Sequence, residues 1–156
     1  HPTRLRRRRP VGPPPRAFGS RPRGSRGRVS LETQAGRAVF AARPQQFVRL
    51  IRLEGKGPTP QPRPMGIAVA PDGSTLYVTT GSFGHLFYVD WKKNAPTGSL
   101  EVGQRPWGIA LMPGGKMAYT ANGPSNDVSL VDLAARQVVK KIAAGTRPWG
   151  VAIIAR

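Results

Sequence analysis

The sequence has no cysteine, no long apolar run and few acidic residues. Without cysteine there can be no disulfides, no thiolate metal ligands and no cysteine nucleophile. No stretch approaches the roughly 18 consecutive apolar residues of a membrane-spanning helix, so no membrane span is expected. Only 7 acidic residues stand against 25 lysines and arginines, which gives the 156-residue chain a formal charge of +18.

Most of this positive charge lies at the start of the chain. Residues 1–46 carry 12 arginines, no lysine and a single acid, Glu32. Arginine, proline, glycine and serine dominate there, and such a segment buries too little apolar surface to offset its ordering entropy. We therefore expect residues 1–46 to be a disordered basic tail.

The arginine clusters of this tail could neutralise the phosphates of a polyanion. However, Phe18 and Phe40 are its only aromatic residues, too few for a platform that stacks bases. A solvated appendage is the simpler interpretation, so nucleic acid is not expected as a partner except through the tail. The chain begins at His1 without the apolar segment of a signal peptide, and we expect it to be a piece of a longer protein.

The rest of the chain is organised around an Arg-Pro-x-Gly tetrapeptide that occurs three times at equal intervals. The copies start at Arg63, Arg105 and Arg147. Residues 63–104 and 105–146 align without a gap and share further glycine, proline, tyrosine and aspartate positions. A fixed period of about 40–45 residues filled with short strands is typical of β-propeller blades.

Each full repeat offers four short segments rich in β-branched, aromatic or small residues, separated by turns with glycine. The predicted strands are 66–70, 75–80, 85–90 and 99–102 in the first repeat, and 108–112, 117–121, 127–132 and 138–143 in the second. Connections of only a few residues force consecutive strands to pair antiparallel, as a meander.

The predicted fold is therefore all-β: an incomplete β-propeller of about two four-stranded antiparallel blades, flanked by single strands and preceded by the disordered basic tail. The blades are 63–104 and 105–146. Residues 47–62 supply the outer strand of a preceding blade (47–54) and a proline-rich link, and 147–156 form the inner strand of an incomplete or closing blade. Closure normally takes four to eight blades, so uncovered blade faces are expected to drive self-association.

Several of these motifs resemble the YVTN β-propeller repeat family. They are Pro71-Asp72-Gly73, Tyr77-Val78-Thr79-Thr80, Val89-Asp90 and the join from Val102 to Gly108. The resemblance is greatest to bacterial propellers associated with pyrroloquinoline-quinone-dependent alcohol oxidation. Fold relatives include cytochrome d1-type and quinoprotein amine dehydrogenase propellers. The resemblance implies an exported binding or accessory module, periplasmic or extracellular if its parent carries a signal peptide.

Five residues are candidates for a binding site at the blade edge. The three repeated arginines, Arg63, Arg105 and Arg147, would be presented in a ring that could hold an anion. Trp107 and Trp149 follow two of them and could line a ligand pocket at the channel mouth, although packing between blades is the simpler interpretation.

No catalytic, cofactor-binding or metal-binding residue is predicted, and no cofactor. His85 has no further metal ligands at suitable spacing. Asp90 and Asp132 recur at the repeat period, which favours turn capping over catalysis. No Ser-His-Asp pattern, P-loop or dinucleotide fingerprint is present.

Three functions remain open from the sequence. The first is a non-enzymatic propeller module, a fragment of a periplasmic YVTN-type protein, that binds a protein partner or a small ligand. The second is a haem- or quinoprotein-associated redox accessory domain, at most part of a redox-enzyme system. The third is polyanion binding through residues 1–46.

Overall fold

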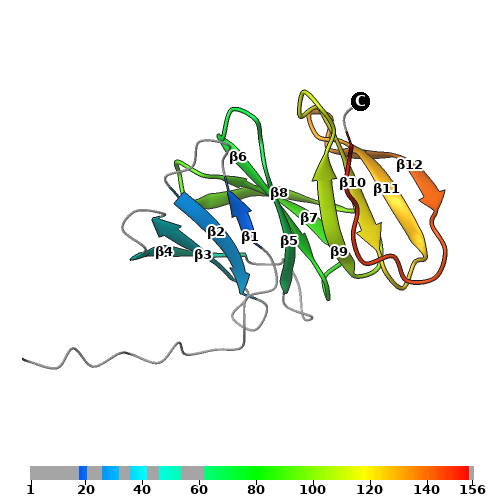
Figure 1. The fold of residues 1–156 in the computed structure, drawn as a ribbon, viewed down its shortest axis with the longest axis horizontal. Coiled ribbons are helices and arrows are strands. Elements are labelled where there is room, and N and C mark those ends of the chain that lie inside the picture. The colour runs from blue at the N-terminus through cyan, green and yellow to red at the C-terminus, as the bar shows by residue number, and fades with distance from the viewer. Residues whose placement is uncertain (1–17, 21–25, 32–35, 42–45, 54–61, 155–156) are drawn as a thin grey trace, which may run out of the picture.

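The chain folds into twelve strands and no helix within the residues that the computed structural model describes, which are 18–20, 26–31, 36–41, 46–53 and 62–154. The strands form three four-stranded antiparallel sheets (Figure 1). The first sheet contains β1 (Phe18–Ser20), β2 (Arg26–Leu31), β3 (Gly36–Ala41) and β4 (Gln46–Arg52). The second contains β5 (Pro64–Val69), β6 (Thr75–Thr80), β7 (His85–Asp90) and β8 (Ala95–Glu101). The third contains β9 (Pro106–Leu111), β10 (Met117–Asn122), β11 (Asp127–Asp132) and β12 (Gln137–Ala143).

The second and third sheets confirm the predicted all-β meander of two blades. Each pairs its strands in chain order, because the turns between them are too short for any other connection. Strands β6, β7 and β11 have the predicted bounds, and β5, β9, β10 and β12 differ from them by one or two residues. Strand β8 corrects the prediction of 99–102, because it begins four residues earlier, at Ala95. Gly73 and Gly115 occupy the same turn with φ of 70° and 69°, a conformation that favours glycine.

The first sheet corrects the expectation that residues 1–46 are disordered. Strands β1, β2 and β3 lie within this range, and β4 joins them rather than standing alone as an outer strand. The register of the first sheet repeats that of the second: Val29 pairs with Phe18 as Val78 pairs with Ile67. The arginine-rich composition had obscured short alternating segments with β-branched or aromatic residues, such as 26–31 and 36–41. The other residues of the proposed tail lie outside the described part.

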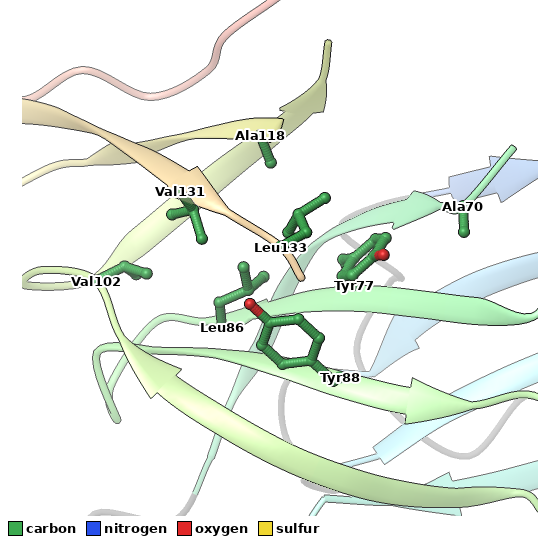
Figure 2. Close-up of a cluster of buried hydrophobic side chains, with 8 residues drawn as sticks. All are labelled: Ala70, Tyr77, Leu86, Tyr88, Val102, Ala118, Val131 and Leu133. Atoms are coloured by element: carbon green, nitrogen blue, oxygen red, sulfur yellow. The ribbon is translucent and has the colours of Figure 1, made fainter. Parts of the chain in front are cut away.

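Two hydrophobic cores lie between the three sheets. The core between the first and second sheets contains Ile51 and Leu53 with the buried residues of one face of the second sheet: Leu76, Val78, Phe87 and Val89. The core between the second and third contains Ala70, Tyr77, Leu86, Tyr88, Val102, Ala118, Val131 and Leu133 (Figure 2). The second sheet is therefore covered on both faces, as expected for stacked propeller blades.

The inner strands approach one another so closely that only glycine fits. A Cβ on Gly66 would lie 2.7 Å from the Trp107 carbonyl oxygen, and a Cβ on Gly108 would lie 2.8 Å from Gly150 Cα. Residues 148–154 thus lie along β9 as β9 lies along β5. They are not a strand, however, because they pair with no other strand among the described residues. The prediction of an inner strand over 147–156 is therefore wrong for the described residues, although the segment does lie at the inner position beside β9.

The described residues contain no helix that is long and apolar enough to cross a membrane.

Candidate functional site

A groove of about 490 Å³ lies where the second and third sheets meet, at the end of the sheets opposite the Pro71 and Pro113 turns. Loops from both sheets line it. They are the β6–β7 loop, the end of β8 with its link to β9, the β10–β11 loop and Lys141 of β12. Its lining residues are Ser82, Phe83, Gly84, Glu101, Gly103, Gln104, Arg105, Pro124, Ser125 and Lys141.

Arg105 enters the groove from the link between the two sheets. Its φ of 47° is unusual for a residue with a side chain and costs on the order of 1 kcal/mol. The conformation turns the chain from the outer strand β8 into the inner strand β9. The guanidinium carbon lies 5.5 Å from the centroid of the Trp107 ring, within the range of a cation–π contact.

Backbone hydrogen bonds hold the rim of the groove. The Val102 and Gly103 N–H groups both donate to the Gly84 carbonyl oxygen, at 3.0 and 3.4 Å. From the third sheet, the Ser125 hydroxyl accepts a 2.7 Å hydrogen bond from the Gln104 N–H. The link that carries Arg105 is therefore tied to both sheets, so the rim is preorganised.

A buried polar cluster centred on Asn122 lies behind this link. Its Nδ2 lies 2.6 Å from Asp127 Oδ1, 2.9 Å from Ser129 Oγ and 3.3 Å from the Val102 carbonyl oxygen. The Ser129 hydroxyl donates to the same carbonyl at 2.6 Å. Gly103 permits this approach, because a Cβ there would lie 2.6 Å from the Asn122 side chain. The third sheet is thus fastened to the end of β8, directly beside the groove.

The lining carries the charge and hydrogen-bonding groups of a site for a small polar ligand. Two cations, Arg105 and Lys141, exceed the single carboxylate of Glu101. Ser125 and Gln104 add uncharged polar groups, and Phe83 provides an apolar wall. Arginine and lysine favour carboxylate or phosphate groups. The arrangement can bind such an anion.

The two candidate tryptophans lie outside the groove lining and pack on each other. The ring centroids of Trp107 and Trp149 are 4.5 Å apart with an interplanar angle of 31°. Trp107 also covers Gly123, where a Cβ would collide with the indole ring. The Trp107 carbonyl accepts a hydrogen bond from the Thr79 hydroxyl at 3.3 Å. Trp107 thus joins neighbouring blades, whereas Trp149 is 62% exposed.

Of the three repeated arginines, only Arg105 lines the groove. Arg63 is exposed at the start of β5, and its carbonyl accepts the Gly81 N–H at 2.8 Å. Arg147 repeats the geometry of Arg105 with φ of 50°, and its N–H donates to Asn126 Oδ1 at 2.9 Å.

Asp90 and Asp132 cap turns, which confirms the interpretation of their recurrence. Asp90 Oδ1 accepts the N–H groups of Lys93 and Lys92 at 2.9 and 2.8 Å. These backbone bonds, with that of Lys93 foremost, lower the pKa of the Asp90 carboxyl. Asp132 Oδ1 accepts the N–H groups of Ala134 and Ala135 in the same way.

His85 begins β7 as a polar residue that contacts its own loop. Its Nδ1 lies 2.6 Å from the Phe83 carbonyl oxygen, and its ring lies 4.3 Å from that of Phe83. No group of three histidine, cysteine, aspartate or glutamate side chains among the described residues is placed to hold a metal ion.

The sequence analysis did not identify Asn122, Ser129 or Lys141. A signal was present: Asn122 and Ser129 replace Thr80 and Phe87, whereas several glycine and proline positions are shared between the two repeats. Positions at which repeats differ are where a specific site can arise.

Comparison with known proteins identifies the fold of this chain but not its family. Hydrazine synthase of Kuenenia stuttgartiensis superposes with a TM-score of 0.79 at 25% identity, over 87% of this chain and 38% of that one. The periplasmic gluconolactonase of Pseudomonas aeruginosa gives 0.74 at 22% identity, over 89% and 42%. The WD40 repeats of RRP9 give 0.72 at 12% identity, over 86% and 40%.

These similarities support the β-propeller fold, and the chain spans about two fifths of the length of the structures it matches. No protein-family profile matches the sequence. No curated protein matches it either.

Proposed function

We propose that this chain is a β-propeller binding module that is not itself an enzyme and that holds a small anionic ligand in the groove. The observation that carries the proposal is the placement of Arg105 and Lys141, from two different parts of the fold, around one groove. Hydrogen bonds to both sheets fix the link that carries Arg105, so little ordering entropy is lost when a ligand binds.

Calorimetric titration with inorganic phosphate and with succinate tests this proposal and separates phosphate from carboxylate ligands. Replacing Arg105 or Lys141 by alanine should weaken binding of the preferred anion about tenfold, which corresponds to about 1.4 kcal/mol. Lys116 is an exposed cation on the β9–β10 turn at the other end of the sheet, so Lys116→Ala is the matched control and should bind like the parent chain. Equal loss in all three variants, or no binding of either anion, contradicts the proposal.

A periplasmic or extracellular location is part of the same proposal. It rests on the likeness of the repeat motifs to exported propellers of the YVTN type, including those that accompany quinoprotein alcohol oxidation. Fractionation of cells that produce the full-length parent checks it, and recovery in the cytosol alone would exclude it.

The redox-accessory alternative has less support, because the His85 imidazole is engaged with the Phe83 carbonyl. Absorbance in the Soret region after haem is added would support the redox-accessory alternative. Polyanion binding would depend on the arginines of residues 1–46. Salt-dependent DNA binding by the chain with and without residues 1–46 tests this alternative, and an unchanged isotherm would exclude it.

A protein partner is also expected, because the third sheet is covered on one face only. The large apolar side chains that are exposed among the described residues all lie in β12 or the segment after it: Val139, Ile142, Trp149 and Ile154. Such a concentration of exposed apolar surface marks an interaction site.

A further inference from the structure

Three charged side chains line the groove without pairing with one another: Glu101, Arg105 and Lys141. Within the part of the chain that the structure describes, no ion pair or side-chain hydrogen bond joins any of them to another residue. Unlike charges attract more strongly the closer they lie. A ligand that carries the complementary charges can therefore gain from one carboxylate and two cations at the same time.

The carboxylate is fixed at the end of the second sheet. Glu101 is the last residue of β8 and pairs with His85 of β7. The Val102 N–H donates to the Gly84 carbonyl oxygen at 3.0 Å, which holds the backbone directly after it. In the third sheet the corresponding residue is Ala143, so the blade does not require an acid at this position. The acid therefore belongs to the groove rather than to the structure of the blade.

The two cations come from other segments of the fold. Lys141 lies on β12, where it pairs with Ser129 of β11. Arg105 lies on the link between the sheets, and its guanidinium carbon is 5.5 Å from the Trp107 ring centroid. Because no described residue accepts a hydrogen bond from its guanidinium N–H groups, these can donate to a carboxylate. Each cation can thus take one anionic group of a ligand.

The groove is larger than a single anionic group needs. Its volume of about 490 Å³ lies within the range of roughly 300–1,000 Å³ of sites for small organic molecules. Phe83 contributes an apolar wall, and its ring lies against that of His85 at a centroid distance of 4.3 Å. A short carbon skeleton that carries several charged groups fills more of this space than phosphate does.

From these open charges we propose that the anionic ligand of the groove is an amino acid with two carboxylates. This inference rests on the proposed function and names the ligand class of the same site. The carboxylates lie against Arg105 and Lys141, and the ammonium group lies against Glu101. The three charged side chains of the lining carry two positive charges and one negative. An acidic amino acid carries the reverse at neutral pH, so every charge has a partner.

The sign of one comparison separates this ligand from a simple diacid. Succinate and L-aspartate have the same carbon skeleton and the same two carboxylates, and only aspartate has an ammonium group. The chain has a formal charge of +18, and cations outnumber the acid in the groove. Without a contact to Glu101, the ammonium group is repelled and aspartate binds more weakly than succinate. With that contact, aspartate binds more tightly.

Calorimetric titration of the full 156-residue chain with both compounds makes the comparison. L-Aspartate should bind about fivefold more tightly than succinate, which is the upper end of the effect of an exposed ion pair. L-Glutamate and glutarate repeat the comparison with one more methylene. If neither amino acid binds more tightly than its matched diacid, this proposal is overturned and the anion site stands. Absence of binding by all four compounds contradicts both proposals.

A charge-removing variant tests the role of Glu101. Glu101→Gln keeps the shape of the side chain, and it should bind succinate about twofold more tightly but L-aspartate more weakly than the parent chain does. Asp72→Asn is the matched control, because it removes the same charge from the β5–β6 turn at the other end of the sheet. It keeps the oxygen that accepts the Ser74 N–H and should preserve the preference for aspartate. A preference that survives in Glu101→Gln, or falls equally in Asp72→Asn, overturns the contact between Glu101 and the ammonium group.

Discussion

The second and third sheets have the same register but are fastened by different chemistry at the groove end. In the second sheet, Phe83, His85 and Phe87 pack ring against ring. In the third, the equivalent residues are Ser125, Asp127 and Ser129, and hydrogen bonds replace the ring contacts. The comparison shows that either aromatic packing or hydrogen bonds can stabilise a propeller blade at the same positions, provided that buried polar groups are paired.

The two sheets also differ in how they are covered. The second sheet has a neighbour on both faces, whereas the third has one. Equivalent substitutions in the two should therefore have unequal effects on the free energy of unfolding.

The largest difference is expected at Leu86, which is 0% exposed in the core between the sheets (Figure 2). Leu86→Ala should lower the free energy of unfolding by about 3 kcal/mol through lost burial and a cavity. Val128 is the equivalent residue of the third sheet and is only partly buried, so Val128→Ala should cost about 1 kcal/mol. Urea unfolding at a protein concentration low enough for monomers measures both. Equal losses would mean that the outer face of the third sheet is covered even in the monomer.

The next largest difference is expected between Asn122 and Thr80, which hold the same position in the two sheets. Asn122→Ala leaves Asp127, Ser129 and the Val102 carbonyl without their shared donor and should cost about 2–3 kcal/mol. The Thr80 hydroxyl donates one hydrogen bond, to the His85 carbonyl at 2.9 Å, and Thr80→Ala should cost about 1 kcal/mol. Thermal and urea unfolding compare them, and a larger loss at Thr80 would contradict the central role of Asn122.

A smaller effect is expected at Arg136, which reaches from the third sheet back to the second. Its Nη1 donates to the Thr97 carbonyl at 3.1 Å, and its guanidinium carbon lies 4.7 Å from the Tyr88 ring centroid. Because the side chain is exposed, Arg136→Ala should cost only about 1 kcal/mol, and Arg136→Lys about half of that. Lys140→Ala, an exposed neighbour on β12, is the control and should leave urea unfolding unchanged.

The smallest effect at neutral pH is expected at Tyr88, whose hydroxyl is buried without a hydrogen-bond partner among the described residues. Burial raises its pKa from 10.0 to about 12. Since the folded state holds this proton more tightly than the unfolded state, the contribution to stability is full below pH 10 and is lost as the pH rises from 10 to about 12. Tyr88→Phe should match the parent at pH 7 and show a smaller loss of stability over that range. An unchanged pH profile would assign the loss to other groups.

Much of the second and third sheets could be predicted from the repeat alone. Their strands, turns and capping aspartates follow from the fixed period and from local preferences for β-branched residues, glycine and aspartate. The first sheet was not predicted because two successive connections between sheets differ in length. The link from β4 to β5 is longer than the link from β8 to β9. The longer link between β4 and β5 hides the match, and composition averaged over the whole of 1–46 hides the alternation. Comparing residues 26–53 with 75–102 directly would have revealed it.

The candidate site was only partly accessible from the sequence. Arg105 was identified because it recurs, yet recurrence also suggested Arg63 and Arg147, which do not line the groove. Lys141 and Asn122 do not recur, and their roles depend on which loop lies opposite which strand. The repeat period does not contain that information.

Local chemistry in the sequence thus decided the strands and their pairing, because neighbouring strands joined by short turns have one way to pair. Only the tertiary structure decided which faces are covered, which arginine enters a groove, and where an inner strand is left without a partner. These properties depend on how one sheet stacks on the next, through contacts between residues of different repeats, and no single repeat encodes its neighbour's position.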